Sequence, residues 1–202
     1  SQTIRVTNKT IDFGLFSLRK IGRMFPDARI DSGKLILDKT LVFENCVFLG
    51  KGLSNIAITN LIFLDCEISS LTLSSLKASS LEISQSNLRS LRVINSTLDR
   101  LKLTKNSNGS GIGSITVFKS EINILLQIEE NEYYQNIGVF ASDIRNAQIR
   151  GNKSALAGFT NNKFLEQVEL IDEAADEVMI RRNTFFEDDR GDVQYLIRYR
   201  SG

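Results

Sequence analysis

The side chains best suited to chemistry in this chain are carboxylates that gather near its C-terminal end. Six of them lie in Glu166–Glu177, and four more lie in Glu187–Asp192. Clustered oxygens suit a hard cation such as Ca²⁺, and paired carboxylates can serve as the acid and base of a glycosidase. The spacing matches no calcium-binding loop, however, and Arg181, Arg182 and Arg190 supply neutralising charge. We therefore expect a solvated acidic face, with no metal ligand, no cofactor and no catalytic residue.

A locally basic stretch in the middle of the chain is the second candidate. Against two acidic residues it holds six cations, namely Lys77, Arg89, Arg92, Arg100, Lys102 and Lys105. A surface of this kind could bind an anionic partner. We take Arg89, Arg92, Arg100 and Lys102 as the candidate binding residues. The alternative is an exposed face on which the cations pair with nearby carboxylates, each pair contributing about 0–1 kcal/mol.

Composition narrows the remaining possibilities. The chain has 202 residues, a net charge of +1 and no histidine. A histidine-based triad, metal site or general base is therefore excluded. A net charge so close to zero argues against a nucleic-acid partner. No run of 18 apolar residues is present, so we expect no transmembrane segment. These features favour a protein that is not an enzyme.

The elements that must position these side chains follow a five-residue period. An apolar or small residue recurs at every fifth position, with a second apolar residue two positions later. The pairs include Leu41/Phe43, Leu61/Phe63, Leu71/Leu73, Leu81/Ile83, Leu91/Val93 and Leu101/Leu103. Neither a helix nor a lone strand has this period. Four fives make a closed coil of twenty residues, so the pattern predicts a solenoid, an all-β right-handed parallel β-helix with about 20–22 residues per coil.

The coil period predicts which side chains become neighbours. It places Glu82 beside Lys102 and Thr72 beside Arg92. Cys46 and Cys66 occupy equivalent positions, so we expect two inward, stacked free thiols in preference to a disulfide. Free thiols favour a reducing compartment, and hence the cytoplasm.

The sequence also indicates where the coils turn corners and where one coil contains an insertion. Asparagines at the corners suit left-handed backbone, and four are expected there: Asn45, Asn95, Asn162 and Asn183. A six-residue signature, apolar at both ends with a small or polar residue in fourth place, recurs from Phe43 to Phe185 with one long spacing of 34 residues. We interpret this spacing as one coil plus an insertion at Lys105–Gly113, which is rich in Gly, Ser and Asn.

The two ends of the chain differ from the middle. Ile4–Phe13 is typical of a first, incomplete coil, and Gly14–Phe25 has the spacing of a short amphipathic helix. We therefore divide the chain into a capping segment (1–40), the solenoid (41–189) and a C-terminal capping strand (190–202). In that last strand Val193, Tyr195, Ile197 and Tyr199 alternate with polar residues. They are candidates for an assembly surface or a cap.

The run Leu61–Leu103 resembles the pentapeptide-repeat family. The resemblance covers about a third of the chain and rests on four triplets: Cys46-Val47-Phe48, Cys66-Glu67-Ile68, Ser86-Asn87-Leu88 and Ser96-Thr97-Leu98. Many of the small positions carry Leu or Ile instead, and the later coils resemble pectin-lyase-like β-helices. The resemblance implies a right-handed quadrilateral or rounded β-helix. It implies little about activity, since these families include topoisomerase-protecting mimics, scaffolds and proteins without known activity.

Two hypotheses for function follow. The first is a non-catalytic β-helix scaffold or protein-interaction module that binds a protein partner or assembles with itself. The alternative is a carbohydrate-binding or carbohydrate-cleaving β-helix of a surface or phage-associated protein, with a polysaccharide as partner. A shallow groove lined by Tyr133, Tyr134 and nearby carboxylates would favour this alternative.

Overall fold

The computed structural model describes residues 2–12, 24–109, 112–132, 134–186 and 194–200, and within 194–200 it describes the side chains of Ile197 and Arg198. All of its named elements are strands. They are β1 (Thr3–Thr7), β2 (Thr10–Asp12), β3 (Arg29–Asp31), β4 (Lys34–Glu44), β5 (Val47–Leu49), β6 (Gly52–Leu64), β7 (Glu67–Ile68), β8 (Leu71–Ser84), β9 (Asn87–Leu88), β10 (Leu91–Ile94), β11 (Thr97–Thr104), β12 (Ser114–Phe118), β13 (Glu121–Glu129), β14 (Tyr134–Phe140), β15 (Asp143–Ile144), β16 (Ala147–Arg150), β17 (Lys153–Thr160), β18 (Lys163–Phe164), β19 (Gln167–Arg181), β20 (Thr184–Phe185) and β21 (Gln194–Arg200).

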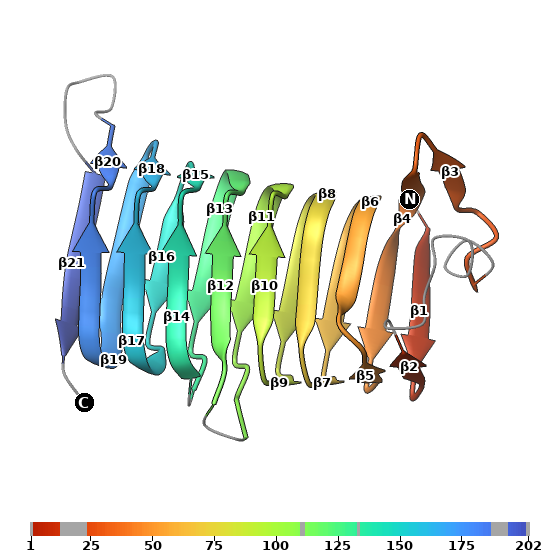
Figure 1. Cartoon of the computed structure of the whole chain (residues 1–202), viewed down its shortest axis with the longest axis horizontal. Coiled ribbons are helices and arrows are strands. Elements are labelled where there is room, and N and C mark those ends of the chain that lie inside the picture. Colours follow the sequence, from red (N-terminus) through yellow and green to blue (C-terminus); the bar gives the residue numbers. More distant parts are fainter. Residues whose placement is uncertain (1, 13–23, 110–111, 133, 187–193, 201–202) are drawn as a thin grey trace.

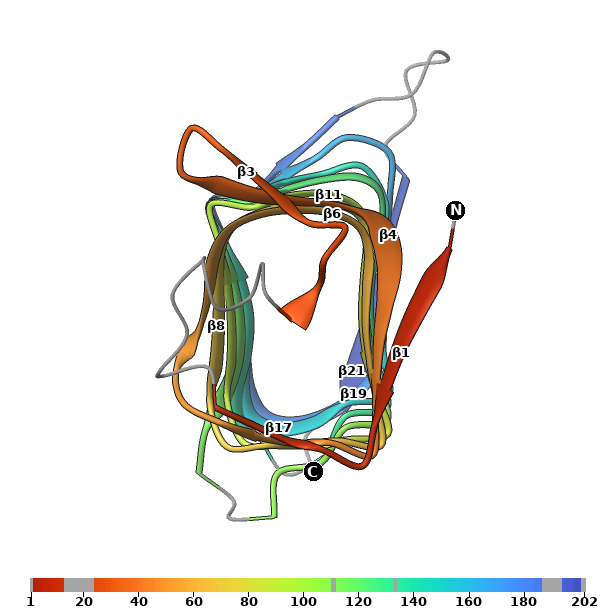
Figure 2. The same cartoon turned by 90° about the vertical axis from the view of Figure 1, so that its right-hand side faces the viewer.

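The strands stack into a parallel β-solenoid of about seven turns, which confirms the predicted fold class. Figure 1 shows the coils side by side along one axis, with β1 and β21 near opposite ends. Seen from the N-terminal end, the cross-section is four-sided and the chain turns clockwise as it recedes (Figure 2). The solenoid is therefore right-handed, as expected for crossovers between parallel strands.

Each coil passes through four columns of paired strands, which we call A, B, C and D. Column A begins with β1, β4 and β6 and ends with β16, β19 and β21. Column B holds β2, β5, β7 and β9. Column C runs through β10, β12, β14 and β17 to residues 177–181 of β19. Column D ends with β15, β18 and β20.

The five-residue period marks the residues that face into these columns. Leu81 and Ile83 are fully buried, whereas Glu82 between them faces outward, since side chains alternate along a strand. A single apolar cluster fills the solenoid from Ile11 to Ala175. Cys46 and Cys66 are buried, free and stacked, as predicted. Burial raises the pKa of the Cys66 thiol to about 11.

The corners are made by left-handed backbone. At the corner from column A to B, one residue per coil has a positive φ. It is Gly151 in one coil and a non-glycine residue in the others, for example Asn45, Asp65 and Gln85. The corner from C to D repeats this with Asn95, among others. A left-handed residue costs about 1 kcal/mol or more outside glycine, so each corner needs compensation from its surroundings.

The compensation at the A–B corner is a buried polar ladder, here called ladder AB. Its members follow the left-handed residue in successive coils: Cys46, Cys66, Ser86, Asn106, Asn131, Asn152 and Glu173. From Ser86 onward each side-chain oxygen accepts the backbone N–H of the preceding coil. Asn131, for example, accepts from Asn106 N and Nδ2 at 3.1 and 3.0 Å, and donates to the Leu103 carbonyl at 2.9 Å.

A second buried ladder, ladder CD, runs along the opposite corner. It consists of Ser96, Ser120, Ser142, Asn162 and Asn183. Each serine accepts an N–H from the coil before and donates its own hydroxyl to a carbonyl two residues earlier. Asn162 and Asn183 therefore point inward, and the prediction that they occupy left-handed corners is wrong. The left-handed residues are Asn161 and Arg182, one position earlier.

The long spacing of the signature also has a different origin from the one predicted. Ile83 lies in column A, but Val117 pairs with Val93 in column C. The signature has moved from corner A–B to corner C–D, which adds half a coil. Register confirms an insertion as well: Ser107 follows Asn87 by 20 residues, whereas Ile115 follows Leu91 by 24. The four extra residues thus fall after Ser107, within the predicted segment.

Apart from the first coil, in which Leu41 follows its partner Ile4 by 37 residues, coil length exceeds the predicted 20–22 residues at two places. Leu101 pairs with Leu126, a coil of 25, and Val168 pairs with Tyr195, a coil of 27. The first of these coils carries the insertion. The second contains residues 187–193, which lie outside the described part of the chain.

The N-terminal end is covered by its own segment. β1 and β2 form the expected incomplete coil, while 13–23, which hold most of the predicted helix, lie outside the described residues. Phe25 packs into the apolar mouth of the solenoid beside Leu35 and Leu41. β3 then turns back through Ser32 and Gly33, both with positive φ, and pairs antiparallel with β4 in column D.

Ladder AB makes a prediction for stability. Replacing Asn131 with Ala removes the acceptor of the Asn106 N–H and side-chain amide, and it takes one donor from the Leu103 carbonyl, all in a buried site. We expect the free energy of unfolding in urea to fall by about 3 kcal/mol. The matched control is Asn123→Ala, an exposed position, which should change it by less than about 0.5 kcal/mol. Equal stability of the two variants would contradict the role of the ladder.

The last member of ladder AB makes stability depend on pH. Glu173 is 1% exposed and accepts from Asn152 N and Nδ2 at 2.9 and 2.7 Å. Burial raises the pKa of its carboxyl from 4.5 to about 7. Ionisation therefore disfavours the folded state: the cost is absent below pH 4.5, grows as the pH rises and is complete above about pH 7. At 1.36 kcal/mol per pKa unit it approaches about 3 kcal/mol.

Glu173→Gln removes this cost, because an amide oxygen can accept both Asn152 bonds, as Asn152 Oδ1 does from Asn131. We expect the variant to be more stable than the parent at pH 8 and nearly equal to it at pH 4.5, measured by urea denaturation. Glu166→Gln is the control, because Arg145 lowers the pKa of this exposed carboxyl, and its difference from the parent should not change between pH 5 and 8. A Glu173→Gln curve that parallels the parent would contradict the assignment.

Candidate functional site

The structure distributes the four candidate basic residues over three faces. Arg100 and Lys102 face outward from column A, Arg92 from column C, and Arg89 follows β9 in column B. They do not form one anion-binding surface. Lys102 lies beside Glu82 with a nitrogen–oxygen distance of 3.8 Å, and Arg92 pairs with Thr72, both as predicted. Whether any of the four binds a partner stays a prediction.

Arg89 lines a groove on the column B face. The groove has a volume of about 350 Å³, and its wall also includes Glu67, Asn87, Leu49 and Gly109. The insertion forms one side of it. Asn108 fastens that insertion to the coil, since its amide donates to the Arg89 carbonyl at 2.9 Å. One cation and one carboxylate on an open wall give no preference for a ligand of either charge.

Three of the six acidic residues of 166–177 pair with cations. Glu166 pairs with Arg145, and Glu169 pairs with Arg150. Asp172 lies 3.7 Å from Arg198 of β21. Within the part of the chain that the structure describes, no three His, Cys, Asp or Glu residues are grouped to hold a metal. The second acidic run, 187–192, lies outside that part.

Tyr134 is not a surface residue. It is 2% exposed, its hydroxyl donates to the Leu88 carbonyl at 2.5 Å, and burial raises the pKa of that hydroxyl above its usual range. Its neighbour at 133 lies outside the described residues. The groove that would favour carbohydrate binding is therefore not formed by Tyr134.

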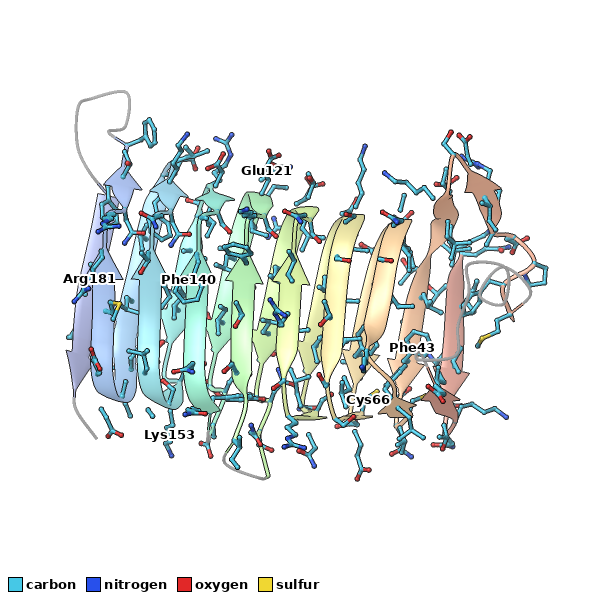
Figure 3. All side chains as sticks on the ribbon, viewed as in Figure 1. Phe43, Cys66, Glu121, Phe140, Lys153 and Arg181 are labelled. Carbon is cyan, nitrogen blue, oxygen red and sulfur yellow. The ribbon has the colours of Figure 1, made fainter. Side chains whose placement is uncertain are left out.

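The remaining candidate is the C-terminal end of the solenoid. β21 continues column A in parallel beyond β19, and its Arg200 reaches column B by pairing with Ala174. Among the described residues, columns C and D reach one coil less, to residues 177–181 of β19 and to β20. The four columns therefore end at different levels in the described part of the chain. We call the ends of columns C and D, which lie one coil below β21 among the described residues, the C-terminal step; Arg181 of β19, labelled in Figure 3, belongs to it.

Backbone groups along this end face away from the solenoid. The Ile171 carbonyl accepts from Gly151 of the coil before at 3.0 Å. Arg198 is the register partner of Ile171, so its carbonyl faces back toward β19. Because direction alternates along a strand, the N–H and C=O of Ile197 face outward. Among the described residues β21 is in register with β19 alone, so no described strand pairs with its other edge.

The same geometry holds in the C-terminal step. The Arg181 carbonyl accepts from Asn161, so Val178 and Ile180 turn their backbone groups outward. Ile180 is 37% exposed although it is in register with the buried Phe159. Phe186, which directly follows β20, is 43% exposed. The end of the solenoid therefore combines free strand edges with exposed apolar side chains.

The predicted assembly or cap residues lie at this end, apart from Val193, which is outside the described residues. Tyr195, Ile197 and Tyr199 belong to β21 through their backbone pairing with Val168, Leu170 and Glu173. Ile197 packs against the core from a partly buried position.

Sequence reasoning missed three features: the two ladders, the buried Glu173 and the C-terminal step. A signal for the first was present, because small or amide side chains replace apolar ones at one position per coil from Ser86 onward. The step left no such signal, since it depends on where the coil phase ends.

Comparison with known proteins adds no information on the fold or the function. No helix in the described part of the chain is long and apolar enough to span a membrane. No protein family, curated protein or solved structure matches the sequence or the fold.

Proposed function

We propose that this protein is a non-catalytic scaffold that assembles through its C-terminal end. The observation that carries the proposal is the uneven level of the described strands at this end, where β21 extends column A one coil beyond the last described strands of columns C and D. An open parallel edge offers backbone donors and acceptors that another strand can satisfy, which is the physical basis of β-strand addition. Native sheets usually cover or interrupt such edges.

The contrast between the two ends supports the proposal. At the N-terminal end, Phe25 fills the mouth of the solenoid and β3 covers column D. At the C-terminal end, β21 is one more parallel rung, with its outward edge presented in the direction of growth. β21 prolongs the parallel stack, whereas β3 pairs antiparallel with β4 and so covers the parallel stack in column D. A rung of this kind functions as an assembly surface.

The distribution of exposed apolar side chains also supports association through the ends of the solenoid. Seven large apolar residues are exposed in the described part of the chain, and four of them lie at the two ends: Met24, Ile30, Ile180 and Phe186. The lateral faces carry paired charges, such as Arg145 with Glu166, which are typical of a solvated surface. Burial of the apolar ends therefore gives association its driving force.

The test is the molar mass by light scattering from micromolar to near-millimolar protein, for the intact chain and for Ile197→Pro. Proline removes only the outward N–H of β21, because the backbone groups that pair with β19 belong to the flanking residues. We expect the mass of the intact chain to rise with concentration and the variant to stay monomeric.

Ile197→Val is the matched control, since it keeps the N–H and should assemble like the intact chain. Circular dichroism and a thermal melt establish that both variants fold. An intact chain that stays monomeric at every concentration, or an Ile197→Pro variant that assembles as well as Ile197→Val, would refute the proposal.

A further inference from the structure

We infer that the partner of the C-terminal end is the N-terminal end of a second copy, stacked in the same direction and without rotation about the solenoid axis. The inference rests on the proposed function and names the surface that the open edge receives. It follows from the profiles of the two ends, from the direction of their backbone groups and from the register of their inward side chains.

The profiles of the two ends are complementary in columns A, B and D. At the C-terminal end, columns A and B reach one coil further than column D, which stops at β20. At the N-terminal end, columns A and B begin with β1 and β2, whereas column D carries the additional strand β3 outside β4. Stacked without rotation, β1 lies over β21 and β3 enters the C-terminal step over β20. A rotation of half a turn would instead place β3 against the part of β21 in column B.

Alternate backbone groups of β1 point away from the solenoid, toward the position of the second copy. The Asn8 N–H donates to the Glu44 carbonyl at 3.2 Å, on the side of the next coil. Alternation turns the N–H and C=O of Thr7 and Arg5 to the other side, away from the solenoid. In the described part of the chain β1 pairs with β4 alone, so this outer edge is open there. One end therefore presents outward groups at Ile197 and the other at Arg5 and Thr7.

Register then assigns the contacts. Val6 pairs with Phe43, and Ile197 pairs with Leu170, and both pairs occupy the same inward position of column A. Val6 of one copy is therefore placed over Ile197 of the other. Within the chain, Asn8 donates to Glu44, which is the register partner of the preceding residue, Thr7. The same one-residue offset between copies pairs the Ile197 N–H with the Arg5 carbonyl. It also pairs the Thr7 N–H with the Ile197 carbonyl.

The side chains at the interface gain burial. Val6 and Ile197 are only partly buried in the single chain, although both face inward. Ile30 lies opposite the buried Leu35 and is 48% exposed at the mouth of column D. Stacking brings Ile30 toward Phe185, which faces inward from β20 and is partly buried. Val6 and Ile30 at one end, and Ile197 at the other, thus become more buried in the stack.

A contact between two different ends does not close on itself. Each added copy presents a new C-terminal end, so the assembly is a rod that lengthens with concentration. Ends that met C-terminus to C-terminus would instead stop at a dimer. The two arrangements predict different dependence of mass on concentration.

The first test mixes two variants with complementary blocked ends. Thr7→Pro removes the outward N–H of β1, and Ile197→Pro removes that of β21. Each variant alone should stay monomeric. An equal mixture should form a one-to-one dimer and no larger species, because only the C-terminal end of the first variant and the N-terminal end of the second remain open. Thr7→Val is the matched control and should assemble like the intact chain.

Each alternative outcome identifies what has failed. If Ile197→Pro is monomeric but Thr7→Pro assembles like the intact chain, the partner surface is not β1; this inference is then wrong and the proposed function stands. A mixture that stays monomeric, or an intact chain that stops at a dimer, also overturns the inference. If both proline variants assemble like the intact chain, the proposed function fails as well.

A second test does not depend on proline. Thr7 and Arg198 occupy the same outward position of column A, and both side chains are exposed. Stacked strands lie about 4.8 Å apart, within the range of a disulfide. Oxidation should therefore join Thr7→Cys to Arg198→Cys in a mixture of the two single variants. The buried Cys46 and Cys66 should stay reduced. A predominance of Arg198→Cys homodimers would show that C-terminal ends face each other, and would overturn the inference.

Discussion

The constraint on which this structure depends is the backbone N–H that follows each left-handed corner. The corner turns the chain from one strand to the next and leaves that N–H pointing along the axis, inside the coil, where no strand runs. A buried N–H without an acceptor costs about 1–3 kcal/mol. Serine, asparagine and finally Glu173 supply the acceptor from the coil above, so each coil stabilises the one before it. The amide side chains make one more hydrogen bond between coils than the hydroxyls do, because Asn131 also donates to a carbonyl of the preceding coil.

A stack held in this way has no natural end. Each coil offers N–H groups and strand edges to a next coil of the same shape, and the solenoid stops only where another element covers them. At one end Phe25 covers the mouth and β3 covers column D, while the outer edge of β1 stays open among the described residues. At the other end the ladder finishes in Glu173, and β21 repeats the parallel pairing without covering columns C and D. The proposed assembly is thus the same interaction that holds the coils together, continued between molecules.

Much of this fold could be predicted from the sequence, because a solenoid converts a local repeat directly into spatial neighbours. The five-residue period placed Leu81, Ile83 and the two cysteines inside, and it placed Glu82 beside Lys102. It failed where the repeat is not local. Asn162 was assigned to a corner because asparagine suits both a corner and a ladder, and the coil phase alone decides between them. Arg89, Arg92 and Lys102 are close in sequence but lie on different faces, since a coil turns a corner about every five residues. The step at the C-terminal end depends on the total phase accumulated over all coils, including the insertion.

The most direct measurement is backbone hydrogen exchange at single-residue resolution, recorded at a concentration where the protein is monomeric and again at a high one. The account predicts that the Asn131 amide, held by Asn152, is protected at both concentrations. The amides of Thr7 and Ile197, which face outward from opposite ends, should exchange quickly in dilute solution and become protected together at high concentration. Rapid exchange at Asn131 would contradict the ladder on which the fold rests. Exchange at Thr7 and Ile197 that does not change with concentration would contradict assembly through the ends.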